Sequence, residues 1–290
     1  METAKRITRP VVRRAVTAAG RSYIAGERLD QAMTTGTDLA GRGYALTLGY
    51  WNANGESPDQ VAQAGMAALE ALHGATCDGY LSIKVPPLRF DASLYATMLD
   101  RARALDVPIH LDSHSHADAE PTWALATEFT PAPRHDLGVT LPARWARSLD
   151  DTKRVVEFGV SVRVVKGQWP DPSDPLRDAR SGFLAIVRRL AGRARRVRIA
   201  SHDVELARTC LKLLRDSGTP CELELLYGLP VGALPVVARD LKVPVRVYLP
   251  YGVGSVPYAL RYLRENPRVL WWLAKDSMLG SYKNRFPVVG

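Results

Sequence analysis

The sequence predicts an α/β protein, a (β/α)8 barrel of the TIM type. Eight short, mostly apolar segments recur along the 290-residue chain, and a helical pattern of apolar positions separates each from the next. Open doubly wound sheets hold roughly five or six strands, so eight repeats favour closure into a barrel. No GxGxxG motif follows any of these segments, which argues against a dinucleotide-binding sheet.

The eight segments are short continuous apolar runs, so we predict parallel strands that are buried on both faces. They span Ala45–Tyr50, Tyr80–Val85, Pro108–Asp112, Leu137–Leu141, Val160–Val165, Val197–Ser201, Glu222–Leu226 and Val245–Leu249. The predicted helices span Asp59–Leu72, Ala92–Leu105, Pro121–Glu128, Leu149–Phe158, Ser181–Ala194, Val204–Ser217 and Val231–Asp240.

The rest of the chain extends this one unit. No change of composition marks a linker, so residues 1–290 are predicted to form a single barrel domain. Residues 1–40 are interpreted as a helical arm before the first strand, and Pro257–Glu265 as a C-terminal helix over the active site. Asp171–Pro175 is a proline-rich loop after the fifth strand.

Composition narrows the class of protein. No apolar run approaches the roughly 20 residues of a membrane-spanning helix, and the basic N-terminal segment lacks the features of a signal peptide. Three scattered cysteines fit reduced core residues, so we expect a cytoplasmic protein. The net charge is +9, but its arginine runs lie along or just after a predicted amphipathic helix. We interpret them as a solvated helix face and expect no nucleic-acid partner.

Polar residues occur toward the C-terminal ends of most predicted strands, where barrel enzymes place their chemistry. They are Lys84, Asp112, Arg163 with Lys166 and Gly167, Ser201 with His202, Glu224 and Tyr248. Buried charges are costly unless they are paired or bind a ligand. One or two such residues would fit ion pairs inside the barrel, but the whole set favours a functional site.

Six segments resemble the proline dehydrogenase family, in the family's order along the chain. Val160–Trp169 (VSVRVVKGQW) is similar to R-[LI]-V-K-G-[AS]-[YW], and Arg246–Asn266 to R-V-Y-x-P-Y-G…Y-L-x-R-R-L-x-E-N. The others are Ser22–Ala32, Ser82–Leu88, Ile199–Asp203 (IASHD, for A-[ST]-H-N) and Glu222–Gly228 (ELELLYG, for E-x-Q-x-L-Y-G). The resemblance implies a divergent relative of the monofunctional bacterial type, with an FAD-containing barrel.

The resemblance assigns residues to FAD. Arg163 would lie near the flavin N5, and the alternative is an ion pair between barrel layers. Val165, Lys166, Gly167 and Trp169 would line the cofactor. Ser201 and His202 would contact its pyrophosphate or adenosine side, although a lone histidine is as often structural. Glu224 replaces the family's Gln, and Glu265 matches a Glu that pairs with arginine on the last helix.

Substrate contacts follow from the same resemblance. Lys84 and Asp112 are expected to form an ion pair under the flavin, and Tyr248 to pack on the substrate. Arg261 would clamp a substrate carboxylate. Tyr258 is a further substrate-side candidate, and Tyr262 stands where the family has its second arginine.

Two further positions depart from the family: Pro142 stands where many relatives carry Gln, and His114 where they have an acidic residue. Together with Tyr262 and Glu224, they fall on the predicted pocket face. We therefore expect an oxidoreductase that converts a C–N bond to an imine by hydride transfer to flavin N5. Its substrate would be an amine or imino acid other than free proline, in specialised metabolism. The electron acceptor would be a quinone or dioxygen, and the basic surface fits loose association with the inner membrane.

Two alternatives stay open. Asp112, His114 and His116 lie two residues apart, a spacing that fits ligands of a metal-dependent barrel hydrolase. The first predicted strand supplies no further ligand, however. The second alternative is a catalytically silent flavin-binding scaffold, which the changes at Glu224 and Tyr262 would permit.

Overall fold

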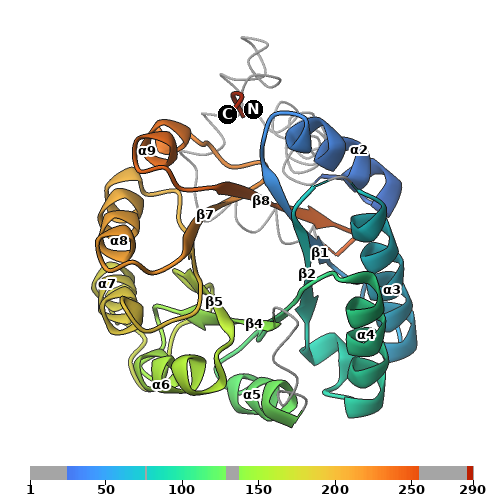
Figure 1. Ribbon diagram of the computed structural model, residues 1–290. Helices are drawn as coiled ribbons and strands as arrows, with labels where there is room; N and C mark the ends of the chain where they lie inside the picture. Colours follow the sequence, from blue (N-terminus) through green and yellow to red (C-terminus); the bar gives the residue numbers. More distant parts are fainter. Residues whose placement is uncertain (1–24, 76, 129–136, 255–285, 290) are drawn as a thin grey trace, which may run out of the picture.

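The architecture is a closed barrel with helices around it. A computed structural model describes residues 25–75, 77–128, 137–254 and 286–289. Its eight strands pair in parallel in sequence order, and β8 (Val245–Tyr251) pairs with β1 (Ala45–Tyr50) to close the ring. The helices surround this ring (Figure 1). The predicted (β/α)8 barrel is confirmed.

The observed elements follow the predicted ones within a few residues. The other strands are β2 (Gly79–Lys84), β3 (Ile109–Asp112), β4 (Leu137–Pro142), β5 (Ser161–Val165), β6 (Val197–Ala200) and β7 (Cys221–Leu226). The helices are α2 (Leu29–Ala40), α3 (Pro58–Gly74), α4 (Ala92–Leu105), α5 (Ala119–Glu128), α6 (Ser148–Phe158), α7 (Ala179–Leu190), α8 (Val204–Asp216) and α9 (Leu234–Asp240), with a short 3₁₀ turn η1 (Pro86–Leu88).

Short polar side chains fix where several helices begin. The carboxylates of Asp91, Asp178 and Asp203 accept backbone N–H bonds at the starts of α4, α7 and α8. Ser57 and Gln60 form a capping box at the start of α3, where Pro58 occupies the first turn. Each of these caps lies where a loop after a strand meets the next helix. The caps therefore help to fix the loops that surround the site.

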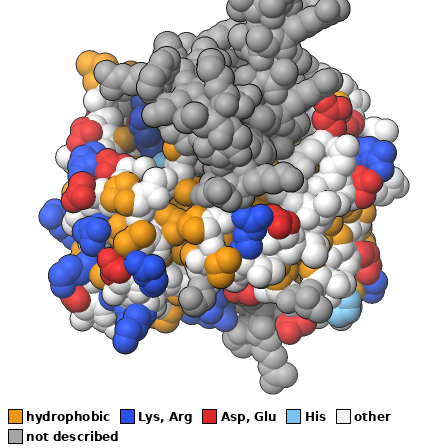
Figure 2. Space-filling model, turned by 90° about the horizontal axis from the view of Figure 1, so that it is seen from above, with side chains coloured by type: hydrophobic (Ala, Val, Ile, Leu, Met, Phe, Trp, Pro, Cys, Tyr) orange, Lys and Arg blue, Asp and Glu red, His pale blue; other side chains and the backbone are white. Residues whose placement is uncertain are grey.

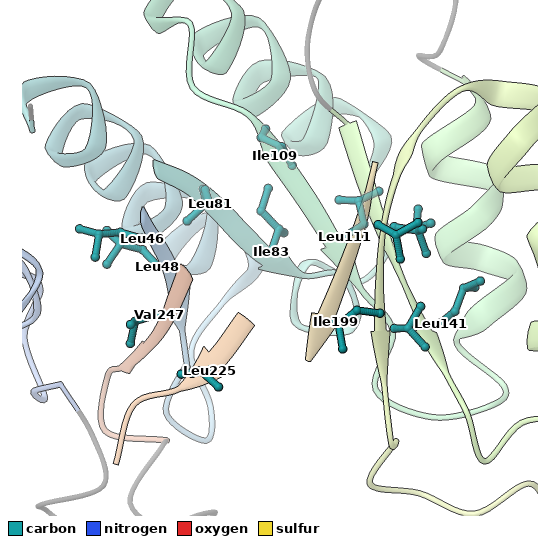
Figure 3. Packing of buried hydrophobic residues seen from close by; sticks show 14 of the residues in the cluster. Leu46, Leu48, Leu81, Ile83, Ile109, Leu111, Leu141, Ile199, Leu225 and Val247 are labelled. Carbon is teal, nitrogen blue, oxygen red and sulfur yellow. The ribbon is translucent and has the colours of Figure 1, made fainter. Parts of the chain in front are cut away.

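The strands are buried on both faces, as predicted, but they are not the continuous apolar runs that the sequence suggested. Leucine, isoleucine and valine alternate along the strands with polar residues, and the apolar set belongs to one core cluster with residues of the helices (Figure 3). The polar set faces the barrel interior, because its members bond to one another across the ring. The period-two alternation is present in the sequence, as in Tyr80, Ser82 and Lys84.

The end of the chain packs against the barrel. Phe286 is buried and contacts the ring of Tyr44 edge-on, with ring centroids 5.4 Å apart, and stacks on Tyr227 at 6.1 Å. The Tyr44 hydroxyl donates to the Pro287 carbonyl over 2.7 Å, and Arg42 donates to the Phe286 carbonyl over 3.1 Å. This segment is therefore held by both packing and hydrogen bonds.

Some expectations fall outside the described residues. They are the first part of the arm (residues 1–24) and the C-terminal helix at Pro257–Glu265. Within the described part of the chain, no helix has both the length and the apolar character needed to cross a membrane.

Candidate active site

The expected site residues lie on neighbouring strands but at two depths. Lys84 and Asp112 are the last residues of β2 and β3 and are register partners. Arg163, Glu224 and Tyr248 lie within β5, β7 and β8 rather than at their ends. Some of the polar residues predicted toward the strand ends therefore lie inside the barrel.

Arg163 is the centre of the inner group. Its guanidinium has five N–H donors, and five acceptors surround it. Nε faces Thr140 Oγ1 at 3.3 Å; Nη1 faces Tyr80 Oη at 3.3 Å and Glu224 Oε1 at 3.0 Å; Nη2 faces Ser82 Oγ at 3.2 Å and Asp112 Oδ1. The alternative expectation for Arg163, an ion pair between strands of the barrel, therefore describes its contacts in the structure.

The two carboxylates are shielded from solvent and otherwise satisfied. Glu224 is 2% exposed and accepts from Thr47 Oγ1 over 3.2 Å and from the Tyr80 hydroxyl over 2.8 Å. Asp112 also accepts from Ser82 and Thr140. Burial alone would raise the pKa of Asp112, but the Arg163 guanidinium holds it below its usual range. Burial would likewise lower the pKa of Arg163, which its anionic neighbours instead raise.

The expected Lys84–Asp112 ion pair is not what the structure contains. Asp112 pairs with Arg163, and Lys84 Nζ donates instead to the Tyr50 carbonyl over 3.2 Å and to the Tyr248 hydroxyl over 3.1 Å. Lys84 Nζ also lies 4.0 Å from the centroid of a Trp51 ring. Arg163 draws the Asp112 carboxylate because its planar fork reaches two carboxylates at once.

Lys84 is a buried lysine with two hydrogen-bond acceptors. Its side chain is buried, and burial lowers its pKa to about 7, with Arg163 adding to the effect and Asp112 opposing it. Gly49 makes room for its partner, because a Cβ at that position would lie 1.9 Å from the Tyr248 hydroxyl. A lysine of this kind changes charge near neutral pH.

A second ionic layer lies deeper in the barrel. Arg246 is fully buried and donates from Nε to Glu222 over 2.7 Å and from Nη2 to Asp78 over 2.8 Å. The guanidinium groups of Arg198 and Arg246 lie 4.5 and 4.8 Å from the ring of Tyr80. This layer closes the barrel beneath the candidate site and has a structural role.

The loop after β5 carries Lys166, Gly167 and Trp169 and is fastened to the turn after β4. Arg144 N donates to the Lys166 carbonyl over 3.2 Å, and Trp145 Nε1 donates to the Trp169 carbonyl over 3.0 Å. Gly167 has φ +88°, and a Cβ there would meet Pro142 Cβ at 2.9 Å. The side chains of Lys166 and Trp169 are exposed, whereas Val165 is half-buried.

His114 lies against this loop. Its ring stacks on Trp169, with centroids 5.9 Å apart, and burial together with the nearby Lys84 lowers its pKa. Its Nε2 atom is buried and has no hydrogen-bond partner among the described residues. An unsatisfied buried ring nitrogen is costly and indicates a missing partner at this place.

His202 has a structural environment. Its Nε2 accepts from Leu226 N over 2.9 Å, so Nδ1 carries the proton and donates to the Pro230 carbonyl at 2.7 Å. The two ring nitrogens bond to the last residue of β7 and to the loop after it, which leaves neither for a cofactor. The Ser201 hydroxyl accepts from Asp203 N over 3.1 Å and keeps its own donor.

The histidines of the possible metal site diverge. Asp112 faces Arg163, His114 stacks on Trp169, and His116 Nε2 lies 3.9 Å from Asp171. In the part of the chain that the structure describes, no three His, Cys, Asp or Glu side chains form a group able to hold a metal ion. Tyr258, Arg261, Tyr262 and Glu265 lie outside the described residues.

Sequence reasoning missed five contributors to the site. Thr47, Tyr80, Ser82 and Thr140 supply hydroxyls to the Arg163 group, and Trp51 supplies the ring beside Lys84. The alternation of polar residues along the strands was a signal for the first four. Nothing in the sequence around Trp51 indicates its contact with Lys84.

Comparison with known proteins finds relatives that are named proline dehydrogenase. No family model matches the chain. Proline dehydrogenase 1 of Bacillus subtilis subsp. natto is 23% identical over 267 residues, covering 85% of this chain and 86% of that protein. Proline dehydrogenase of Deinococcus radiodurans is 24% identical over 288 residues, covering 89% of each chain. Along most of its length the chain is therefore similar to proline dehydrogenases, at 22–24% identity.

Solved structures support the same fold. Proline utilization A from Bdellovibrio bacteriovorus, inactivated by N-propargylglycine, matches with a TM-score of 0.73 at 18% identity, over 94% of this chain. Proline utilization A from Corynebacterium freiburgense matches with a TM-score of 0.69 at 17% identity. This chain spans about a third of those longer chains, 35% and 33% respectively.

Proposed function

We propose that this chain is an FAD-dependent dehydrogenase that oxidises the C–N bond of proline or a related amine to an imine. One juxtaposition carries the proposal: Lys84 with Tyr248 lies beside the Asp112–Arg163 pair, and Lys84 and Asp112 end their strands as register partners. It occurs in a chain that aligns along 85–89% of its length with proteins named proline dehydrogenase.

The residues after β5 provide the kinds of groups that could hold a flavin. Gly167 brings backbone close to β4, Trp169 and Lys166 are exposed, and the orphaned His114 Nε2 needs a partner beside them. Val165, Lys166, Gly167, Trp169 and the Ser201 hydroxyl would hold the cofactor, with Arg163 and Glu224 as charges beneath it. When bound, FAD supplies the two-electron acceptor for the hydride that leaves the carbon next to nitrogen.

Lys84 is the group that takes the proton of the substrate ammonium. Loss of hydride requires the neutral amine, and a base near pH 7 is best suited to accept the proton. The pKa of Lys84, lowered by burial to about 7, meets this requirement. The proton passes from the substrate nitrogen to Lys84 Nζ, and departure of the hydride then leaves a protonated imine.

Tyr248 and Trp51 position this base and exclude water from it. The Tyr248 hydroxyl accepts from Lys84, and burial together with Asp112 raises the pKa of Tyr248, so the hydroxyl stays neutral. Trp51 covers Lys84 with an aromatic face. Arg261, outside the described residues, is the candidate for a substrate carboxylate.

The substrate is proposed to differ from free proline. Glu224, Pro142 and His114 depart from the family pattern, and all three lie at or beneath the mouth of the barrel. Tyr262, where the family has a second arginine, removes one charge-assisted contact worth roughly 1.5–3 kcal/mol. Turnover of L-proline should be compared with cyclic and secondary amines and amino-acid derivatives, using an artificial dye as acceptor. Efficient turnover confined to L-proline would refute this part.

A quinone or dioxygen is the proposed acceptor for the electrons.

Loose contact with an anionic membrane is the proposed location of the protein. The net charge of +9 supports this contact. On the face in Figure 2, however, Lys and Arg are interspersed with Asp and Glu. Sedimentation with anionic vesicles at low salt tests the contact, and absence of binding there would remove it.

A further inference from the structure

Glu224 is a second carboxylate on an arginine that already has one. Asp112 by itself balances the charge of Arg163, and the Arg163–Glu224 pair is buried, with side chains 6% and 2% exposed, while the Asp112 side chain is 13% exposed. Arg163, Asp112 and Glu224 together therefore carry one net negative charge beneath the mouth of the barrel. A neutral side chain at position 224 would leave the pair balanced.

The hydrogen-bond donors around the Glu224 side chain suit a carboxylate. Oε1 accepts from Thr47 Oγ1 over 3.2 Å and from Arg163 Nη1 over 3.0 Å, and Oε2 accepts from the Tyr80 hydroxyl over 2.8 Å. Donors thus surround both oxygens, and neither oxygen faces an acceptor. A group in this position is held in one orientation and pulls the guanidinium toward β7 and away from the strand ends.

We propose that Glu224 is a positioning residue that keeps the Arg163 guanidinium inside the barrel and gives the Arg163–Asp112 pair a net negative charge, so that a flavin held by the loop after β5 is harder to reduce than with glutamine at position 224. The inference rests on the proposed function. Its physical basis is that reduction adds negative charge to the flavin, which a free guanidinium stabilises and a nearby carboxylate opposes.

The test compares FAD-loaded wild-type protein with Glu224→Gln, which has nearly the same shape and lacks the charge. Flavin midpoint potential is measured by equilibration with reference dyes, and sulfite affinity by loss of visible absorbance, because sulfite adds to oxidised flavin as an anion. Glu224→Gln should move the potential to more positive values. It should also tighten sulfite binding on the order of tenfold, the effect of removing one unit charge about 12 Å away at an effective dielectric constant of about 20.

Glu222→Gln is the matched control. Glu222 lies two residues earlier on β7, faces the same interior and pairs with Arg246, and no contact joins it to Arg163. Its loss should change the potential and the sulfite affinity much less. Equal values for wild type and Glu224→Gln, or equal shifts in both variants, would overturn the inference.

A further variant keeps the inference testable if Glu224→Gln does not fold well enough to bind flavin. If Glu224→Gln fails to retain flavin, Glu224→Asp keeps the charge but shortens the side chain by one methylene. It should shift both measurements in the same direction and by less, and unchanged values would overturn the inference. Failure of the wild-type protein itself to bind FAD would instead overturn the proposed function, and this inference with it.

Discussion

Lys84 Nζ lies 4.0 Å from the centroid of a Trp51 ring, and the described residues form no ion pair with it. The lysine is buried in contact with an aromatic face, a carbonyl and a hydroxyl. Each of these contacts favours the ammonium, but burial away from water outweighs them and favours the neutral amine. The chemistry proposed for this protein and its dependence on pH both follow from that preference.

Replacing Lys84 by methionine should stabilise the protein at and below neutral pH. The folded-state pKa of Lys84 is about 7, against 10.5 for an ordinary lysine, so between these values the unfolded chain binds more protons. Stability of the wild-type protein therefore rises with pH across this window. Urea denaturation from pH 6 to pH 10 should show a slope in the wild type that is reduced in Lys84→Met. Parallel profiles would contradict the assignment.

The same pKa predicts the pH dependence of turnover. If Lys84 accepts the substrate proton, kcat/KM rises as pH passes through about 7. Lys84→Arg keeps a cation but loses the base, because arginine stays protonated at any usable pH. We expect it to bind FAD and to lose activity on the order of 10²-fold or more. An arginine variant with wild-type kcat/KM would exclude Lys84 as the base.

Removing Arg163 should destabilise the barrel more than removing its whole ionic group. Arg163→Met leaves Asp112 and Glu224 buried without their cation, at a cost of roughly 3–5 kcal/mol in the free energy of unfolding. The triple variant with Asp112→Asn and Glu224→Gln removes the uncompensated charges and should recover part of that loss. Chemical denaturation at pH 7 measures both. A triple variant less stable than Arg163→Met would contradict this account.

The segment 286–289 should contribute to stability through one side chain. Phe286 is 5% exposed between Tyr44 and Tyr227, so Phe286→Ala should cost roughly 3–5 kcal/mol. Val288 in the same segment is 75% exposed, and Val288→Ala should stay within about 0.5 kcal/mol of the wild type. Thermal and urea unfolding of the two variants give the comparison. Equal effects would show that the Phe286 contacts do not stabilise the barrel.

Much of the fold was predictable because strand and helix periods are local properties of the chain. Ala45–Tyr50 and Ala92–Leu105 match the observed β1 and α4 at both ends. The inward face of the barrel was misjudged because each strand was considered as one run. Alternation of Tyr80, Ser82 and Lys84 with leucine and isoleucine marks the two faces separately.

The partners of the site residues were less predictable. Lys84 and Asp112 are register neighbours, yet the carboxylate of Asp112 pairs with Arg163 two strands away. Which side chains meet inside a barrel depends on its stagger and on side-chain length, and neither is a local property. His202 shows the same limit, since the two backbone groups that hold it come from the end of β7 and from the loop after it.

The central claim is that this barrel binds FAD and uses it to oxidise a C–N bond. The visible absorption spectrum of the purified, FAD-reconstituted protein, followed anaerobically as L-proline and then other secondary amines are added, tests it most directly. We predict a flavin spectrum that bleaches with at least one of these amines. A protein that stays colourless after incubation with FAD, or a bound flavin that none of them reduces, would contradict the claim.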